Sequence, residues 1–357
     1  MPLEFQRLSM HGIVEAAFCV SAFVTFLFLG SIALPGRIEV GGPSAGGSSQ
    51  KHKLNGLLLF LLVMFGALAG HWAGLFSLAS IPPRLPALFV AANVLAFTVS
   101  FALLLRKRGR KTLADFFYGV DITSSWLRVD LKMFSYRPSL IGLGLINLSL
   151  AALQIKLHGH LSMRMALYQI FCFVYLANYF QFEYGMLFTW DMLVECFGWM
   201  LVWGDYVLVP FFYALPGWYL LHNLDPLPPA GVAGAVLLYI GGFWLFRGAN
   251  QQKNRFKRDA NARIWGRPAR SLEGRLLVSG FWGIGRKLNY TGELCMYYAW
   301  TLLCGFESFV PYLVPLWLTI FLPHRAWRDE KRCRTKYGGL WEQYCSHARF
   351  RMIPFVY

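Results

Sequence analysis

One carboxylate, Asp205, lies inside a long apolar stretch of this sequence, in the motif Trp203-Gly204-Asp205-Tyr206. An ionisable group in such a stretch is costly to bury and is by default a candidate for function. Pro210 should break the helix, so that the carboxyl could point into a cavity and deliver a proton. A buried Asp that is hydrogen-bonded to a neighbouring helix is an equally good interpretation.

Three more carboxylates, Glu183, Asp191 and Glu195, precede that stretch, in a segment (182–195) without Lys or Arg. They could supply a proton or bind a hydroxyl group. A solvated acidic loop would have the same composition, so both interpretations stay open.

Basic residues with aromatic and amide neighbours recur in the last third of the chain. Lys253 and Lys257 are four residues apart, so a helix would place both on one face, where they could bind phosphates together. The alternative is a juxtamembrane basic helix that contacts anionic lipid. Trp282 could stack on a flat ligand and Asn289 could recognise an amide, unless both belong to an interfacial aromatic belt.

The residues Arg325, Arg328, Asp329 and Arg332 recur at intervals of three and four. On a helix this spacing puts a carboxylate among guanidinium groups, which suits a phosphorylated cofactor, although a surface helix of paired charges would look alike. His324 has no second His or Cys at ligand spacing, so we expect a hydrogen-bonding histidine and no metal site.

Several common active-site patterns are missing from the sequence. Neither a phosphate-binding GxxxxGK[ST] loop nor a strand–GxGxxG–helix context occurs, which excludes a Rossmann domain. The seven cysteines form no CxxC pair, so neither a zinc site nor a disulfide framework is expected.

The composition indicates that membrane helices must position these residues. Of 357 residues, 56% are hydrophobic and only 15% are charged, which is far from a soluble globular domain. Apolar runs of roughly 20 residues, long enough to cross the hydrocarbon core, occur near 11–34, 56–80, 86–105, 139–155, 163–181, 196–221 and 230–246. A further stretch, 293–322, contains Gly305 and Pro311 and should form a hairpin of two short helices. We therefore predict an all-α polytopic membrane protein with eight to ten helices.

The positive charges fall on one side of this topology. If successive spans alternate in direction, one side holds 37–54, 106–138, 182–195, 247–290 and 323–357. These segments carry 30 of the 34 Lys and Arg residues. The positive-inside rule then places this side and the C-terminus in the cytosol, and it explains the formal net charge of +16 without nucleic-acid binding.

The chain changes in character near residue 246. Residues 1–246 are mostly apolar spans with short connections, whereas residues 247–357 alternate basic, aromatic-rich segments with short apolar ones. We predict that residues 1–246 form an apolar membrane part and that residues 247–357 build a pocket that is partly open to water.

With these residues laid out, the chain resembles the membrane sterol reductases, a family that includes sterol Δ14-reductases, 7-dehydrocholesterol (Δ7) reductases, Δ24(24¹)-reductases and the membrane part of the lamin B receptor. The matching blocks in the last 110 residues are RGANQQKN (247–254), LLVSGFWG (276–283), RKLNY (286–290), HRAWRDEKRC (324–333), KYGGLWEQY (336–344) and RMIPFVY (351–357). Earlier blocks are LPG (34–36), KLNG (53–56), DLKMFSYRP (130–138), LINLS (145–149) and FGWMLVWGDYVLVPF (197–211).

The resemblance implies a multi-pass enzyme of ten transmembrane helices that reduces a carbon–carbon double bond of a sterol with NADPH. It implies a sterol-facing part, 1–246, and a C-terminal NADPH-binding part, 247–357, in the endoplasmic reticulum or, in bacteria, the plasma membrane. Its partners would be sterol and membrane lipid; the oligomeric state stays open. By motif, the expected cofactor-binding residues are Lys253, Lys257, Leu277, Trp282, Asn289, Arg325, Asp329 and Tyr337.

Two positions depart from the family pattern. Many members have Arg where Lys257 stands here, which puts a bidentate phosphate contact in doubt. Val194 replaces a His that relatives often carry before the acidic residue, so Glu195 or Asp191 would have to act without it.

The implied reaction needs both an acid and a cationic pocket. An isolated alkene accepts hydride poorly, so protonation to a tertiary carbocation should come first. A carboxyl in an apolar pocket, or a tyrosine, can provide this proton. Asp205 and Glu195 are the preferred candidates for the proton donor, and Tyr206 and Tyr337 are the second choice.

The motifs favour Δ14-reduction, through LPG, RGANQQKN and RMIPFVY, with Δ7-reduction as the alternative supported by FGWMLVWGD and LINLSLAALQIKLHGH. Membrane methyltransferases of the isoprenylcysteine type have a similar C-terminal outline, but they usually read RHPxYxG where this chain has RKLNYTG. A non-catalytic sterol-binding protein is the remaining alternative.

Overall fold

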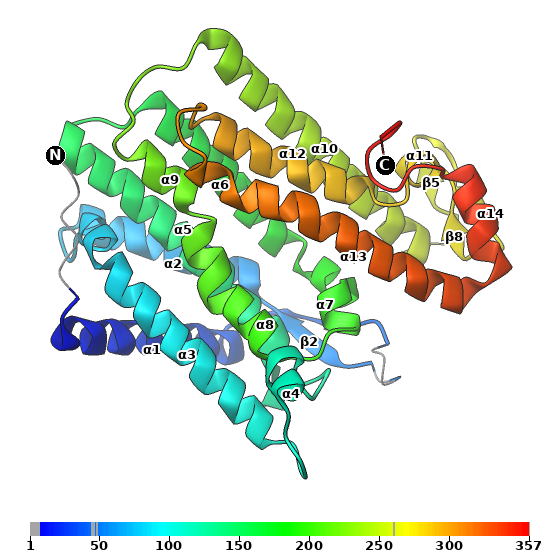
Figure 1. The fold of residues 1–357 in the computed structure, drawn as a ribbon, viewed down its shortest axis with the longest axis horizontal. Coiled ribbons are helices and arrows are strands. Elements are labelled where there is room, and N and C mark those ends of the chain that lie inside the picture. Colours follow the sequence, from blue (N-terminus) through cyan, green and yellow to red (C-terminus); the bar gives the residue numbers. More distant parts are fainter. Residues whose placement is uncertain (1–7, 44–46, 48, 260, 357) are drawn as a thin grey trace. The chain divides into compact units, whose positions relative to one another are not determined.

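The computed structural model describes residues 8–43, 47, 49–259 and 261–356. Most of this chain is helical, and the described strands form four short antiparallel hairpins (Figure 1). The chain packs into two compact units that divide between Leu224 and Asp225. The boundary that we drew from composition, 246/247, falls inside one continuous helix and remains a prediction about function.

Unit 1, the part up to Leu224, is a bundle built around one long helix. Its long helices are α1 (Met10–Ala33), α2 (Gly56–Trp72), α3 (Leu85–Leu105), α5 (Leu131–His158) and α6 (Met163–Gln181). Its short helical segments are η1 (Leu78–Ser80), η2 (Pro82–Arg84), α4 (Leu113–Tyr118), η3 (Glu183–Phe188), α7 (Trp190–Leu193), α8 (Trp199–Trp203), η4 (Gly204–Phe212) and α9 (Leu215–Leu220). The strand pairs are β1 (Arg37–Val40) with β2 (Lys51–Leu54), and β3 (Ser125–Trp126) with β4 (Val129–Asp130).

Helix α5 is the centre of unit 1. It contacts α1, α2, α6, η4 and α9, and most of its residues are buried. Asp130 caps its start, where the side chain accepts a hydrogen bond from the Met133 backbone N–H at 2.8 Å, and Gly159 ends it in a left-handed conformation with φ of 77°. The helix therefore presents the DLKMFSYRP segment, which forms its first turns, to the interior of unit 1.

The apolar stretch 196–221 is broken, as its sequence predicts. It consists of α8, the π-helix η4 and α9, and Asp205 and Pro210 both lie within η4. Proline removes a backbone donor, and π-helical turns occur frequently at functional sites. The break places Asp205 among the buried side chains of unit 1.

The predicted span 56–80 is shorter in the structure. Helix α2 ends at Trp72, and Gly74 follows with a φ of 71°, a conformation that glycine adopts without strain. The chain then turns through η1 and η2 into α3. The apolar run predicts one helix because the residues after the turn are also apolar, so hydropathy does not mark where α2 ends.

Unit 2, the part from Asp225, is built on α10 (Pro229–Arg258), α12 (Leu288–Leu302) and α13 (Leu313–Tyr337). Helix α10 packs along α12, and α12 contacts α13 (Figure 1). The smaller elements are β5 (Arg263–Ile264), β6 (Arg267–Pro268), β7 (Ser271–Leu272), β8 (Leu276–Leu277), α11 (Phe281–Ile284), η5 (Val310–Tyr312) and α14 (Gly339–His347). The predicted break within 293–322 is confirmed, since Gly305 has a φ of 72° and Pro311 lies in η5 between the two helices.

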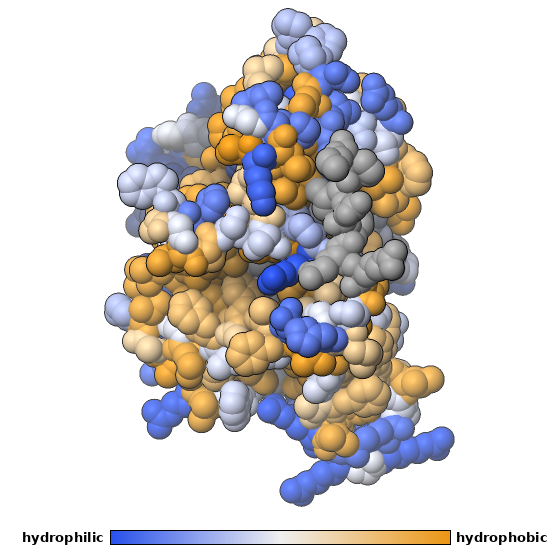
Figure 2. All heavy atoms as spheres, turned by 90° about the vertical axis from the view of Figure 1, so that its left-hand side faces the viewer, coloured by the Kyte–Doolittle hydropathy of each residue, from blue (hydrophilic) through white to orange (hydrophobic). Residues whose placement is uncertain are grey.

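Five helical segments of the described chain are long and apolar enough to cross a membrane. They are Met10–Ala33, Leu78–Leu105, Leu131–His158, Trp199–Leu220 and Pro229–Arg258, and Gly56–Trp72 is a shorter apolar helix. Figure 2 shows one face on which apolar side chains cover broad areas. Such exposed apolar surface fits contact with lipid.

Two glycines allow α10 and α12 to approach closely. A Cβ atom added to Gly242 would lie 2.8 Å from the Gly292 carbonyl oxygen, and one added to Gly292 would lie 2.5 Å from the Phe246 nitrogen. Small residues at such a crossing let two backbones pack directly against each other. The neighbouring residue, Gly241, would meet nothing within 4 Å.

This pair of adjacent glycines gives a test of the α10–α12 contact. We expect Gly242→Ala to destabilise the protein by about 1–3 kcal/mol, because the added methyl group overpacks the crossing. Gly241→Ala in the same helix should be neutral or stabilising by up to about 1 kcal/mol, because alanine is the better helix former. Thermal unfolding in detergent measures both, and equal midpoints for the two variants would contradict the crossing.

Candidate functional site

Asp205 is buried in unit 1 and accepts a hydrogen bond from the hydroxyl group of Ser135 on α5. The two side chains come from η4 and from the first turns of α5, so the π-helical break and the DLKMFSYRP segment meet at this carboxylate. Tyr206 is also buried, within an apolar cluster that includes Val202 and Val207. The structure thus brings Asp205 to a polar partner and packs Tyr206 among apolar side chains.

Glu195 is held by a different set of contacts. Its carboxylate accepts a hydrogen bond from the indole N–H of Trp190 at 2.6 Å. The buried ammonium group of Lys132 donates to the backbone carbonyls of Asp191 and Glu195, each at 2.8 Å. Lys132 therefore fixes the loop that carries both acids, a function that sequence reasoning missed although the residue belongs to DLKMFSYRP.

Glu183 has a structural environment that excludes a solvated loop. Its carboxylate lies 3.0 Å from the Arg137 guanidinium and accepts the backbone N–H of Gly56 at 2.9 Å. All three residues are buried. The carboxylate thus stabilises the N-terminus of α2 and neutralises a buried arginine at the same time.

Tyr179 on α6 is a residue that the sequence did not single out. Its hydroxyl oxygen is buried and has no hydrogen-bond partner in the described structure. The side chain lies within electrostatic range of Asp205 and Glu183. A buried hydroxyl group without a partner is costly, so a ligand is a reasonable candidate for the missing partner.

In unit 2, three of the predicted cofactor-binding residues meet. The ammonium group of Lys253 lies over the Trp282 ring, 4.8 Å from its centre. The Trp282 indole N–H donates to the Ala249 carbonyl at 2.8 Å, and Leu277 packs in the same buried cluster. The last turns of α10, the strand β8 and helix α11 therefore form this group together.

Asn289, at the start of α12, offers an open acceptor. Its amide nitrogen donates to the side-chain oxygen of Asn250 at 3.3 Å. Its own side-chain oxygen is buried and has no partner in the described structure. This oxygen could accept a hydrogen bond from an amide or amino group of a ligand.

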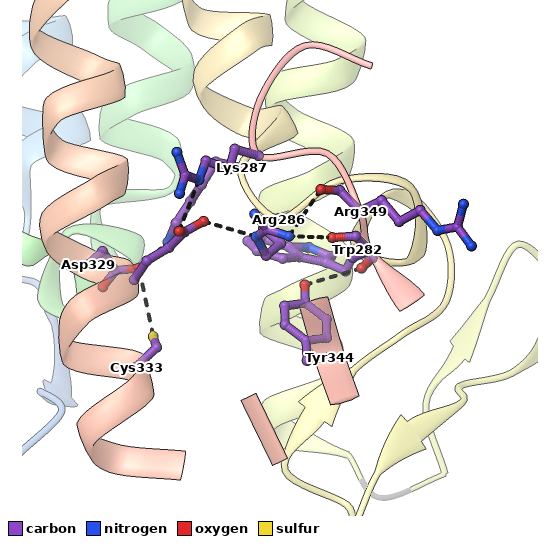
Figure 3. A network of polar contacts seen from close by, with 10 residues as sticks. Trp282, Arg286, Lys287, Asp329, Cys333, Tyr344 and Arg349 are labelled. Atoms are coloured by element: carbon purple, nitrogen blue, oxygen red, sulfur yellow. Dashed lines mark hydrogen bonds and ion pairs between the residues drawn. The ribbon is translucent and has the colours of Figure 1, made fainter. Parts of the chain in front are cut away.

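Asp329 lies beyond the apolar part of α13 and pairs with Lys287, as Figure 3 shows. Burial would raise the pKa of Asp329, but the charge and the hydrogen bond of Lys287 lower it below its ordinary value. Burial would likewise lower the pKa of Lys287, yet Asp329 raises it above its ordinary value. Burial, together with Asp329, raises the pKa of the neighbouring Cys333 thiol to about 11. The pair therefore stays charged at neutral pH.

The remaining predicted residues have contacts of their own. The Arg325 guanidinium lies 4.8 Å from the centre of the Phe321 ring. Tyr337 stacks on Trp341 at 6.4 Å between ring centres and lies under the Arg275 guanidinium. Another tyrosine of this segment, Tyr344, contacts Trp282: its hydroxyl group donates a hydrogen bond to the Trp282 carbonyl at 3.1 Å (Figure 3).

These residues suit a phosphorylated dinucleotide. Lys253 and Lys257 both lie within electrostatic range of Lys287 and of the one carboxylate, Asp329. A cluster of lysine side chains such as this one can bind anionic groups. Together with the open Asn289 oxygen and the Trp282 ring, these lysines provide contacts for phosphate, amide and ring systems.

Comparison with known proteins decides the family. Residues 6–357 match the ergosterol biosynthesis ERG4/ERG24 family. The chain belongs to this family. Its relatives include a Δ14-sterol reductase of Arabidopsis thaliana, 35% identical over 96% of both chains, and one of Methylotuvimicrobium alcaliphilum, 38% identical over 92% of this chain and 81% of the other. A 7-dehydrocholesterol reductase of Xenopus laevis is 34% identical over 89% of this chain and 73% of the other.

Membership in the ERG4/ERG24 family confirms the resemblance that the sequence blocks indicated. Tyr344, the last residue of the block KYGGLWEQY, contacts Trp282, and the sequence did not single it out. The final residue of RMIPFVY, Tyr357, lies outside the described residues. The assignment of individual cofactor-binding residues stays a prediction.

The two tyrosines of this block can be separated by experiment. We expect Tyr344→Phe to lower stability by about 1 kcal/mol, because it removes a buried hydrogen bond to the Trp282 carbonyl. Tyr337→Phe keeps the ring that stacks on Trp341 and should change stability by less than about 0.5 kcal/mol. Thermal unfolding of the full chain measures both. Equal effects would mean that the Tyr344 hydroxyl group does not support Trp282.

Proposed function

We propose that this protein is a membrane sterol reductase, and that its reaction is reduction of the Δ14 double bond. The observation that carries the proposal is identity of 35–38% to proteins named Δ14-sterol reductase, over at least 81% of either chain. The motifs LPG and RGANQQKN favour the same bond. Reduction of the Δ7 bond is the second candidate, because proteins named 7-dehydrocholesterol reductase are 33–34% identical over at least 73% of either chain.

The cofactor in this proposal is NADPH, which when bound supplies a hydride. Lys253 and Lys257 would bind its phosphates, since they share the cationic cluster around Asp329. Trp282 offers a ring for stacking, with its indole N–H already bound to Ala249. Asn289 would accept a hydrogen bond through its open side-chain oxygen.

The proton in this proposal comes from a buried carboxyl of unit 1. Asp205 is the first candidate, because it is buried and bonded to the neutral hydroxyl group of Ser135. Glu195 is the second, held by Trp190 and by the loop that Lys132 anchors. Protonation of one alkene carbon leaves positive charge on the other, and an apolar surrounding keeps water from capturing it.

The membrane arrangement follows from the same proposal. Ten transmembrane helices would require α6, α12, α13 and shorter segments to cross beside the five long apolar ones. The basic segments and the C-terminus would face the cytosol, in the endoplasmic reticulum of a eukaryote or the plasma membrane of a bacterium. A methyltransferase is disfavoured by the RKLNYTG block.

Sterol analysis of cells tests the function directly. Expressed in cells that lack Δ14-reductase, the protein should remove the accumulated Δ14-unsaturated sterols, whereas cells that lack Δ7-reductase should keep their Δ7-sterols. Mass spectrometry of extracted sterols measures both. Conversion in the second strain alone would establish Δ7-reduction, and no conversion in either strain would contradict the proposed function.

Substitution of the two acids tests the proton donor. We expect Asp205→Asn to lower turnover at saturating NADPH by about 10²–10⁴-fold, the usual contribution of a general acid. Glu195→Gln should have a smaller effect. The exposed Glu342→Gln is a matched control for loss of one carboxylate and should leave turnover unchanged. If Asp205→Asn and Glu195→Gln both keep full activity, neither carboxyl group is the proton donor.

A further inference from the structure

The β5–β6 hairpin of unit 2 carries a tryptophan at its tip. Ile264 pairs with Arg267, so Trp265 and Gly266 form a two-residue turn. Both have positive φ angles, 50° and 77°, as the central residues of a type I′ turn do. Glycine adopts this left-handed conformation without strain, and asparagine is the usual residue at the first position. A tryptophan is strained there, so the local backbone does not explain its presence.

Burial does not explain Trp265 either, because 58% of its surface is exposed. Its ring contacts Phe281, with 5.1 Å between the ring centres and 79° between the planes. Phe281 is buried and also contacts Trp244 on α10, at 4.8 Å between the ring centres. We call these three rings the aromatic column. It has an exposed tryptophan at each end.

The aromatic column continues the exposed apolar face of α10. Leu237, Ile240 and Trp244 recur at intervals of three and four, and all three are exposed, so they share one face of the helix. Gly248 comes four residues later on this face, and a Cβ atom added there would lie 2.6 Å from the Phe281 ring. Glycine therefore leaves the room in which Phe281 packs against α10.

The aromatic column lies at the level expected for the membrane surface. Helix α10 is apolar up to Phe246 and polar from Arg247, where RGANQQKN begins. The column starts at Trp244, before this change, and packs at Gly248, after it. Tryptophan is enriched at this level of membrane proteins, because its ring suits hydrocarbon and its N–H suits water and headgroups.

Positive charge surrounds the exposed end of the aromatic column. Residues 261–275 contain four arginines and a single acidic residue, Glu273. Arg263 and Arg267 flank the turn, and both are exposed. The Nε–H of Arg263 donates to the Gly266 carbonyl at 3.0 Å, which helps to close the turn. Arginines next to an interfacial tryptophan are complementary in charge to the phosphates of anionic lipid.

Unit 1 contains a hairpin of the same kind. The β3–β4 turn consists of Leu127 and Arg128, which have positive φ angles of 46° and 64°. Trp126 and Leu127 are exposed, and the Trp126 ring stacks on Phe28 of α1 at 5.0 Å between the ring centres. Both hairpins lie in segments that the positive-inside rule assigns to one side of the membrane. A strained turn that exposes apolar and basic side chains therefore occurs in each unit.

We propose that the β5–β6 hairpin binds anionic phospholipid at the membrane surface, with Trp265 among the headgroups and Arg267 on a lipid phosphate. This inference rests on the proposed membrane arrangement and does not depend on which sterol bond is reduced. Phe281 holds the tip beside α10, so the hairpin meets the lipids that surround this helix. Contact with lipid then offsets the strain at Trp265.

Photocrosslinking of the full chain in bilayer nanodiscs tests the contact. The nanodiscs contain equal amounts of phosphatidylcholine and phosphatidylglycerol, and the two probe variants are Trp265→benzoylphenylalanine and Trp244→benzoylphenylalanine. Position 244 is the matched control, because its neighbours on α10 face hydrocarbon. We expect the lipid adducts at position 265 to be enriched in phosphatidylglycerol at least about twofold relative to position 244, because basic residues at the surface attract anionic lipid. Mass spectrometry of the adducts measures this ratio.

Substitution of Arg267 in the position-265 probe variant tests the role of charge. Arg267→Glu should abolish the enrichment and Arg267→Lys should keep it, because the first reverses the charge and the second retains it. Both substitutions are at an exposed position. Enrichment that survives Arg267→Glu would overturn the assignment of this side chain to the lipid phosphate.

The probe variants alone also decide the proposal, even where an Arg267 variant does not fold. Equal lipid ratios at positions 265 and 244 would overturn it, as would adducts at position 265 with protein only or with nothing. Absence of lipid adducts at position 244 would instead contradict the membrane arrangement on which the proposal rests. Sterol conversion in cells tests the reaction separately.

Discussion

Burial of charge is the constraint on which this structure depends. A charged side chain removed from water must find an opposite charge or several hydrogen bonds, or it destabilises the fold. Arg137 meets Glu183, and Arg286 meets Glu330 and two backbone carbonyls. Lys132 meets carbonyls of the Asp191–Glu195 loop. In each case the compensation joins segments far apart in sequence, so these buried charges also determine how the loops close.

Much of this organisation was predictable from the sequence. Hydropathy placed the long helices, and Pro210, Gly305 and Pro311 marked the two breaks, because proline and glycine interrupt helices for local reasons. The matching blocks indicated the family before any contact was known. The spacing of Lys253 and Lys257 also placed both on one helix, α10, as the structure has them.

The contacts between distant segments were not predictable in the same way. The contacts of Lys132 and Lys287 join residues that are 63 and 42 positions apart in the sequence. The Tyr179 hydroxyl group stands out only because it is buried without a hydrogen-bond partner in the described structure. No local sequence pattern encodes either feature. The early end of α2 was missed because apolar residues continue past the turn at Gly74. The contact of Tyr344 with the Trp282 carbonyl has no local signal either, because the block KYGGLWEQY contains two tyrosines and only the fold shows which of them reaches that carbonyl.

The pattern of compensation also separates the candidate acids. An ion pair acts only while both members are charged, so a carboxylate that neutralises a buried cation cannot also deliver a proton without leaving that cation alone. Glu183 neutralises Arg137 in this way, and Glu195 lies within electrostatic range of Lys132. Asp205 instead accepts a hydrogen bond from the neutral Ser135 hydroxyl group, and the charge in its electrostatic range is another carboxylate, Asp191. Of these three carboxyls, Asp205 can therefore change its protonation state at the least cost to the fold, and an acid catalyst must lose and regain its proton in every turnover.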